Sequence, residues 1–420
     1  MSVLDIVALL IVFAALFGTL NHFFLRLPST IGITVVALLA SLLVIGVDWV
    51  VPPLDLAATA RGFVLDIDFS EALLKGMLGL LLFAGALHVR LEDLAQEKWI
   101  VAIMASLGVL ISTLIIGVGV HWLLGIPFLV ALVFGSLISP TDPVAVLGVL
   151  KTADVPKSLE TKIAGESLFN DGIAYVVFLI LVAIAFGAGE GHGAQAGHGT
   201  IGAVDIAQLF VVEAGGGAVL GGVLGYLVFL VMRRIDDYSL EVLLTLALAF
   251  GGYALASALH MSGPITVVIA GLFIGNTGIV HAMSEKTREH VDAFWRLIDE
   301  ILNAVLFLLI GLEVFAVSFD VVSPGMAATV IALVLGARTI AVLVSMTLLR
   351  RFRTFLPGSA PILIWGGLRG GISVALVLSL PANEWQTELL TLTYAVVLFS
   401  IIVQGLSVPA VVNRFARDQI

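Results

Sequence analysis

Long apolar stretches with little charge between them dominate this sequence of 420 residues. Hydrophobic residues make up 60% of the chain and charged residues 12%, whereas soluble domains are about 45–50% apolar and about 25% charged. A helix needs about 17–25 mostly apolar residues to cross a bilayer. The chain contains thirteen such stretches, at 3–22, 30–49, 70–88, 99–121, 127–149, 161–188, 201–231, 239–260, 263–279, 291–316, 323–349, 359–381 and 389–412. The sequence therefore predicts an all-α polytopic membrane protein with about 13 transmembrane helices.

Positive residues lie almost entirely on one side of the predicted membrane. Every second loop and the C-terminal tail together hold 15 of the 20 Lys and Arg residues, and the opposite side holds one, Arg61. Cytoplasmic loops carry an excess of Lys and Arg, so we expect the N-terminus outside the cell and the C-terminus in the cytoplasm. The first stretch lacks a basic leader and a cleavage site, which favours a retained helix over a signal peptide.

The composition excludes several other classes of site. Without cysteine, the chain cannot form a disulfide scaffold, a thiolate zinc site or an iron–sulfur cluster. It has no Lys/Arg-rich block or aromatic platform for nucleic acid, so we expect no nucleic-acid partner. The Gly-rich connection at 187–199 contains His192 and His198. A metal site there is an alternative, but a plain linker is the favoured interpretation.

Two predicted spans contain helix-breaking residues near their middle. The fifth reads SLISPTDPVAV, in which prolines 140 and 143 bracket Thr141 and Asp142, and the twelfth reads IWGGLRGGISVAL, in which four glycines surround Arg369. Proline removes a backbone donor and clashes with the preceding turn. Unpaired backbone in a bilayer persists only where it lines a cavity or is buried in protein. Broken helices in corresponding places of two halves therefore indicate a transporter site.

The positions of the two broken spans also predict a repeat. They lie seven spans apart, and an odd offset reverses the direction of a helix. A repeat that relates helices 1–6 to helices 8–13 is therefore inverted, with the seventh helix as an unpaired connector. The alternative is that the glycines only allow close helix packing, and we would prefer it for the twelfth span alone. Together with a broken helix that carries a carboxylate, the transporter interpretation is favoured.

The sixth span carries the densest set of polar side chains, in the segment GESLFNDGIAYVVF. Glu166 and Asn170 share one ridge of this helix, and Ser167 and Asp171 share the next. A charge at bilayer depth costs about 2.5–3.5 kcal/mol, so such residues are candidates for function. Hydroxyl, carboxylate and free carbonyl oxygens are ligands that suit a hard cation.

Two arginines inside the spans are the positive partners of these acids. Arg338 lies in the eleventh span and Arg369 in the twelfth, and because arginine stays protonated we expect each to lie against an acid. A pair of Glu166 with Arg338 would leave Asp171 as the only titratable charge that faces a cavity. Burial disfavours a bare carboxylate, so a proton and a cation would compete for the same oxygens. That competition is itself a mechanism of exchange.

Each of these residues also has a structural alternative. The alternative for Asp142 and Arg369 is that they neutralise the dipoles of the broken helix ends and have no direct role in transport. For Glu166, Asn170 and Arg338 an architectural role is the favoured interpretation. A further polar set within 294–313 has no assigned role, and its members are Arg296, Asp299, Glu300, Asn303 and Glu313.

Four segments of the chain resemble the monovalent cation:proton antiporter-1 family, which includes bacterial NhaP-type antiporters and animal sodium/proton exchangers. They are SPTDPVAV (139–146), GESLFNDG (165–172), FWRLIDEILNAVLFLLIGLE (294–313) and GGLRGGISVAL (366–376), in the family's order and spacing. The resemblance implies one multi-pass transporter domain over 1–420 in the cell membrane, without a cofactor, that forms a homodimer. It implies a core of about 99–188 and 323–412 that moves like an elevator, and a dimerisation scaffold of about 3–88 and 201–316.

The resemblance also assigns roles residue by residue. Its ion-coordinating positions fall on Asp171, Ser167 and Thr141, the expected Na⁺ site. The residues that support this site in similar proteins correspond here to Asn170, Glu166 and Arg338. The residues at the crossing point of the two broken helices correspond to Asp142 and Arg369.

One position departs from the family. In several relatives the segment that matches LLFAGALHV has an acidic ligand after the phenylalanine, and here that residue is Ala84, with His88 nearby. The pair Asn170–Asp171 resembles the electroneutral branch, since electrogenic relatives carry two aspartates there.

We therefore expect exchange of Na⁺ or Li⁺ for H⁺, electroneutral and one to one. A K⁺/H⁺ antiporter of the same family is one alternative, and an ion-coupled organic-anion symporter that uses Arg369 is another. A cation channel would need a filter of carbonyls or acids, and an intramembrane hydrolase would need a catalytic set that the membrane histidines do not supply.

Overall fold

A computed structural model describes most of the chain, and every statement about the structure concerns these residues. They are 3–51, 53, 56–66, 69–142, 146, 157–187, 208–315, 317, 321–350, 355 and 357–416. The histidines of the 187–199 connection and Pro143 lie outside them. The described residues contain helices and no strand, which confirms the predicted all-α fold class.

Helical segments lie in each of the thirteen predicted stretches. The α-helices are α1 (Val3–Leu20), α2 (Ser29–Val50), α3 (Leu56–Asp66), α4 (Phe69–Glu71), α5 (Leu78–His88), α6 (Leu91–Leu124), α7 (Phe128–Ile138), α9 (Lys157–Phe186), α11 (Gly217–Met232), α12 (Tyr238–Ala258), α13 (Gly263–Phe273), α14 (Ile279–His281), α15 (Glu285–Leu312), α16 (Pro324–Leu349), α17 (Ser359–Trp365), α18 (Gly371–Leu378), α19 (Gln386–Leu398) and α20 (Gly405–Ala416). Within the described residues eight helices are each long and apolar enough to cross a membrane. The count of thirteen spans and the inverted repeat remain predictions.

Short π-helical and 3₁₀ segments continue several of these helices. The π-helical segments are η1 (Asn21–Leu25), η3 (Ala72–Met77), η4 (Val211–Gly216), η5 (Ile274–Gly278) and η7 (Phe399–Gln404), and η6 (Glu313–Phe315) is a 3₁₀ turn. A π-turn interrupts the regular i to i−4 ladder and is frequent at functional sites. Of these segments, η7 matters most here, because it joins α19 to α20 beside the twelfth predicted span.

Some boundaries differ from the sequence prediction. Helix α3 lies in a segment that was expected to be a loop, and α6 begins at Leu91, two turns before the predicted span. Lys162, which was counted as a loop cation, lies in α9 and is 3% exposed. Its Nζ is 3.2 Å from Oε1 of Glu97 on α6, and it donates to Ser158. A charged first turn lowers the hydropathy of a helix without ending it, so hydropathy alone places these boundaries too late.

The broken spans are visible in the backbone. Helix α17 ends at Trp365 and α18 begins at Gly371, with a non-helical segment between them. Helix α7 ends at Ile138, and the next four residues are not helical. Of the second half of that span, only Val146 is described.

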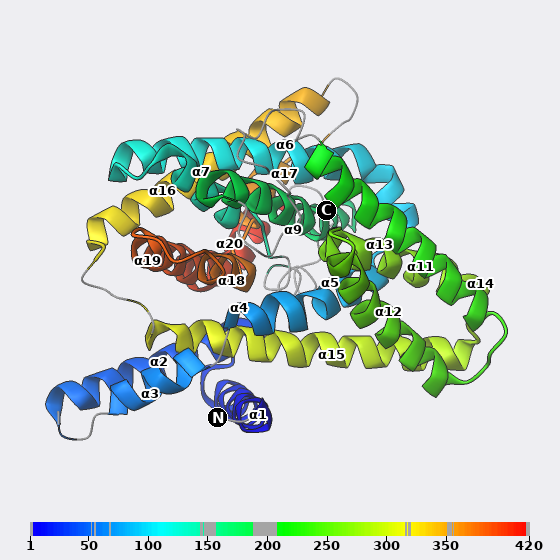
Figure 1. The fold of residues 1–420 in the computed structure, drawn as a ribbon, viewed down its shortest axis with the longest axis horizontal. Helices are drawn as coiled ribbons and strands as arrows, with labels where there is room; N and C mark the ends of the chain where they lie inside the picture. The colour runs from blue at the N-terminus through cyan, green and yellow to red at the C-terminus, as the bar shows by residue number, and fades with distance from the viewer. Residues whose placement is uncertain are drawn as a thin grey trace.

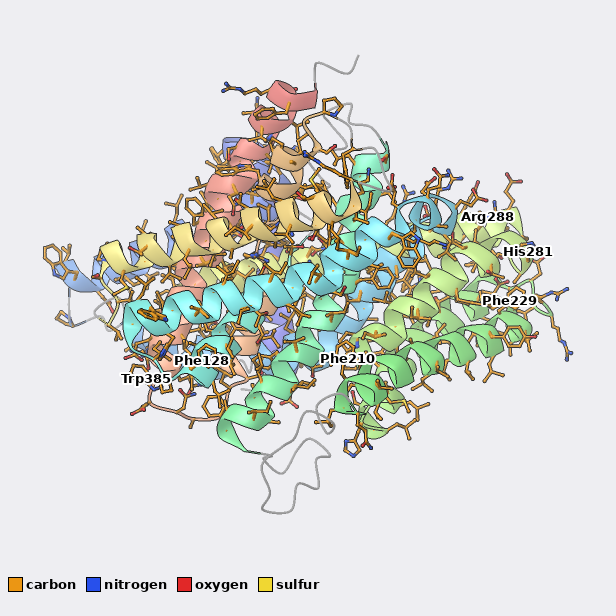
Figure 2. The ribbon with its side chains drawn as sticks, turned by 90° about the horizontal axis from the view of Figure 1, so that it is seen from above. Phe128, Phe210, Phe229, His281, Arg288 and Trp385 are labelled. Atoms are coloured by element: carbon orange, nitrogen blue, oxygen red, sulfur yellow. The ribbon has the colours of Figure 1, made fainter. Side chains whose placement is uncertain are left out.

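The helices form groups around these breaks (Figure 1). Helix α6 packs against α7, α9 and α16, and α18 packs against α19 and α7. Helix α15 runs along one side of this group and contacts α2 and α5, while α11, α12 and α13 form a further bundle. In Figure 2, Phe128 and Trp385, next to loops expected on one side of the membrane, lie at one end of the molecule, and His281 and Arg288, from a loop expected on the other side, lie at the opposite end.

Helices α2 and α15 approach each other closely at Gly311. The hydroxyl of Thr34 donates to the carbonyl of Phe307 at 3.0 Å, and Ser41 donates to the carbonyl of Gly311 at 3.4 Å. A Cβ atom on Gly311 would lie 2.9 Å from the carbonyl oxygen of Thr34 and would collide with Ala37. The absence of a side chain at Gly311 is therefore required for this helix contact.

We predict that Gly311→Ala lowers the free energy of unfolding by about 1–3 kcal/mol, because an overpacked contact forces the backbones apart. Thermal unfolding of the purified protein in detergent measures this loss. Gly46→Ala on α2 is the control, since a Cβ there would meet no atom within 4 Å. A Gly311→Ala protein that melts like wild type would contradict the packing argument.

Candidate functional site

The two broken spans satisfy each other's backbone. The backbone N–H of Asp142, beyond α7, donates to the carbonyl of Leu368 at 2.8 Å. In return, Nη1 of Arg369 donates to the carbonyls of Ser139 and Pro140, the second at 2.8 Å. In a continuous helix the carbonyl of Ser139 would be left without a donor, because Pro143 has no N–H. The crossing therefore supplies partners to backbone groups that lipid could not satisfy.

Glycine is required at the crossing because the two segments are in contact. A Cβ atom on Gly370 would collide with the carboxylate of Asp142. A Cβ atom on Gly367 would collide with the guanidinium of Arg338. The absence of a side chain at Gly370 thus makes room for Asp142, and its absence at Gly367 makes room for Arg338. Here the close approach explains the glycines more fully than helix packing alone.

Polar side chains of α9 lie against the residues that follow α7. The hydroxyls of Thr141 and Ser167 are 3.0 Å apart, and the amide of Asn170 donates to the Thr141 hydroxyl at 2.7 Å. The backbone N–H of Thr141 donates to the side-chain oxygen of Asn170 at 3.3 Å. All three residues are buried. The amide of Asn170 therefore holds the broken backbone and aligns both hydroxyls on the same side.

Asp171 lies one turn after Ser167 on the same face of α9. Its side chain is buried, with 6% of the residue exposed, and its Oδ1 has no hydrogen-bond partner among the described residues. The charged groups of Asp142 and Arg369 lie within electrostatic range of it. An unpaired buried oxygen is costly and rare. This carboxylate, beside the hydroxyls of Ser167 and Thr141, is therefore a candidate to take up a proton or a cation.

The donor set has the chemistry of an alkali-cation site. One carboxylate, two hydroxyls and nearby backbone carbonyls are all hard oxygen ligands. Within the described part of the chain, no group of three or more His, Asp or Glu side chains is arranged to hold a metal ion. A single carboxylate supplies one negative charge, which balances one monovalent cation or one proton.

Arg338 and Glu166 form a buried ion pair behind this site. The pair is bidentate, with Nη1 against Oε1 and Nη2 3.0 Å from Oε2. Nη2 also donates to the carbonyl of Leu363 at 2.8 Å. Since bidentate pairs fix geometry as well as charge, Arg338 ties α16 to both α9 and α17. The positive charge of Arg338 balances the negative charge of Glu166, as predicted from the sequence.

Arg369 has partners that the sequence did not indicate. Its side-chain hydrogen bonds among the described residues go to the carbonyls that follow α7. Backbone carbonyls at a helix C-terminus carry partial negative charge, so they act as its partners. The expected acidic neighbour of Arg369 stays a prediction.

Two functional candidates were missed at the sequence level. Ser400 accepts a hydrogen bond from the backbone N–H of Arg369 at 2.8 Å, and Gln404 hydrogen-bonds Ser400. Both are buried, and both lie in η7. Uncharged polar residues in an apolar span are a weak signal. The spacing of four residues between them could have indicated a shared polar face.

The position of the missing acid is occupied by a fully buried Ala84 on α5. Nδ1 of His88 donates to the carbonyl of Ala84 at 2.7 Å, and Nε2 lies 3.2 Å from Asp292 on α15. Asp292 is also 2.9 Å from Arg296. One ring nitrogen of His88 is therefore bonded within α5 and the other lies against α15, so both nitrogens are engaged away from Asp171.

We predict that Arg338→Met and Glu166→Gln each lower the free energy of unfolding by about 3–5 kcal/mol, because each strands one buried partner. The double variant should lose less than the sum of the two. Chemical and thermal unfolding measure these losses.

The exposed pair of Arg296 with Asp292 supplies the control, because Arg296→Met should change the free energy of unfolding by less than about 1 kcal/mol. Strictly additive losses in the Arg338–Glu166 double variant would mean that the pair contributes no coupling.

Comparison with known proteins places this geometry in context. Residues 10–414 match the family model described as "Sodium/hydrogen exchanger, transmembrane". The chain is 49% identical to the Na(+)/H(+) antiporter NhaP of Pseudomonas aeruginosa over 99% of its own length and 98% of that protein. It is 39% identical to the Na(+)/H(+) antiporter NhaH of Halobacillus aidingensis over 82% of the chain and 83% of that protein.

A solved structure shares the fold. The sodium proton antiporter MjNhaP1 of Methanocaldococcus jannaschii at pH 8 superposes with a TM-score of 0.75 over 99% of both chains, at 17% sequence identity. At this identity the likeness concerns the fold alone. It agrees with an all-helical membrane architecture for this chain.

Proposed function

This chain belongs to the sodium/hydrogen exchanger family, and we propose that it exchanges Na⁺ or Li⁺ for H⁺ through competition of the two ions for the carboxylate of Asp171. The chain is a transporter and not an enzyme, and the exchange needs no cofactor beyond the transported ions. One observation carries the proposal. The buried Oδ1 of Asp171 has no described partner, and Ser167, a turn earlier, shares a hydroxyl contact with Thr141.

The competition follows from the surroundings of Asp171. A buried carboxylate cannot remain bare at low cost, so it holds either a proton or a cation. When the proton leaves, the carboxylate together with the hydroxyls of Ser167 and Thr141 offers oxygens to an alkali cation. Asn170 keeps the Thr141 hydroxyl in place. The two ions use the same oxygens, so binding of one releases the other.

The charge balance supports an electroneutral cycle. Glu166 is matched by Arg338, and Arg369 is held by carbonyls, so neither needs to change protonation during exchange. Asp171 then carries one Na⁺ in one direction and one H⁺ in the other. One cation exchanged for one proton moves no net charge.

An elevator movement is the proposed route across the membrane. The contacts of the crossing and the Arg338–Glu166 pair join α7, α9, α16 and α17, all within 99–188 and 323–412. This part would move as one body against a scaffold of 3–88 and 201–316, which would also form the homodimer. The N-terminus would lie outside the cell and the C-terminus in the cytoplasm.

We predict that Asp171→Asn abolishes exchange and leaves the protein folded, because asparagine keeps the shape but cannot release a proton or balance a cation. Purified protein in vesicles with an imposed pH gradient, with Na⁺, Li⁺, K⁺ and Ca²⁺ added in turn, measures the exchange. Wild type should dissipate the gradient with Na⁺ or Li⁺, whereas a response to K⁺ alone would favour a K⁺/H⁺ antiporter. Normal turnover by Asp171→Asn would refute the site.

We also predict that the initial rate of Na⁺/H⁺ exchange does not depend on membrane potential. Vesicles clamped with K⁺ and valinomycin at potentials of opposite sign should give equal rates. Rates that differ with the sign of the potential would show that net charge moves in the cycle. The stoichiometry of one to one would then be wrong, even if Asp171 remained the binding group.

A further inference from the structure

Three polar side chains lie along one face of the last predicted span, at positions 400, 404 and 407. We call Ser400, Gln404 and Ser407 the last-span stripe. Their spacing of four and three residues places them on the same side of the helix. Each makes a hydrogen bond either to the segment between α17 and α18 or to Trp365, the last residue of α17. The stripe therefore faces the broken twelfth span along its length.

The hydrogen bonds of the stripe secure both ends of the broken segment. Ser400 accepts from the backbone N–H of Arg369 at 2.8 Å and donates to Oε1 of Gln404 at 2.8 Å. Nε2 of Gln404 donates to the carbonyl of Trp365 at 3.3 Å. The orientation of the Gln404 amide is thereby fixed, with its oxygen toward Ser400 and its nitrogen toward Trp365. One N–H of the segment before α18 and one carbonyl at the end of α17 are thus satisfied.

Burial makes these bonds consequential. Ser400 is 1% exposed, Gln404 is 3% exposed and Arg369 is 2% exposed. An unsatisfied backbone group at such a site loses its whole solvation, because water does not replace the missing partner. The N–H of Arg369 without Ser400 would seek another acceptor and would displace its own segment.

A displacement of Arg369 would move the residues of the candidate ion site through two sets of hydrogen bonds. Its guanidinium holds the carbonyls of Ser139 and Pro140, and the neighbouring carbonyl of Leu368 holds the N–H of Asp142. Thr141 lies between these two anchored positions. The position of its hydroxyl therefore depends on the segment that the stripe secures.

We propose that Ser400 and Gln404 are positioning residues of the ion site, which set the affinity for the cation by fixing the backbone of Arg369 against the residues that follow α7. Neither touches the cation, and both act through the crossing. The inference rests on the proposed exchange at Asp171 and goes beyond it. It assigns a role in cation binding to the last span, which contributes no ligand of its own.

The test compares Ser400→Ala with Ser400→Thr and with Ser41→Ala. Ser41 is an equally buried serine, at 1% exposed, whose hydroxyl donates to the carbonyl of Gly311 in the α2–α15 contact and makes no hydrogen bond to the broken span. In vesicles, Ser400→Ala should raise the Na⁺ concentration for half-maximal exchange about fivefold or more, with a maximal rate within about twofold of wild type. Ser400→Thr, which keeps the hydroxyl, and Ser41→Ala should both stay close to wild type.

The pH profile gives a second readout that a loss of stability alone would not move. If Ser400→Ala weakens the binding of the cation and not that of the proton, the cation displaces the proton only at higher pH. The pH dependence of the exchange rate should then shift to the alkaline side. The thermal stabilisation of the purified protein by Na⁺ should also be smaller for Ser400→Ala than for wild type, Ser400→Thr and Ser41→Ala. An unchanged half-saturation and pH profile for a folded Ser400→Ala would overturn the proposal.

Gln404→Met keeps the test decisive if Ser400→Ala does not fold, because it removes the amide but keeps the volume. Gln404→Met should also raise the Na⁺ concentration for half-maximal exchange. Equal changes of that concentration for Gln404→Met and Ser41→Ala would count against a specific role of Gln404. Wild type is the separate control for the function itself. Absence of Na⁺/H⁺ exchange by wild type would refute the proposed function, whereas exchange by wild type with unaltered variants would refute only the positioning role.

Discussion

The pairing of backbone groups at the crossing is the constraint on which the rest of the structure depends. A helix that stops inside a bilayer exposes carbonyls and N–H groups that lipid cannot satisfy. Here each broken span supplies partners to the other, through Asp142 with Leu368 and Arg369 with Pro140. The glycines follow from this arrangement, since a side chain at Gly370 would separate the two segments. The candidate ion site thus lies beside two backbone segments that hydrogen-bond each other.

Two arginines stabilise this arrangement in different ways. Arg338 neutralises Glu166 and links three helices, while Arg369 neutralises the partial charge of released carbonyls. Replacement of such groups by apolar residues can be neutral for stability, but removal of one partner is not. The hydrogen bonds of both arginines go to other groups, and neither arginine hydrogen-bonds Asp171 in the described structure. The one group that we propose to titrate is thereby kept available.

The sequence was sufficient for the all-helical fold class, for the two breaks and for one buried ion pair. Hydropathy predicted the helical stretches, and the prolines and glycines predicted both breaks, because these signals depend on local chemistry. Charge balance predicted the pair of Glu166 with Arg338. The carbonyl partners of Arg369 and the role of Ser400 were not predicted, since a hydrogen bond to a backbone group leaves no trace in residue type. Helix α3 was missed because its hydropathy is low.

The distance along the chain between the two breaks has a consequence for biogenesis. Arg369 and Ser139 are separated by 230 positions. At ribosomal rates of about 5–20 residues per second, the carbonyls after α7 wait roughly 10–50 s for their partner. Until then they must be sheltered by the insertion machinery or by transient water. A chain that ends before the second break would therefore leave these carbonyls without the partner that Arg369 supplies.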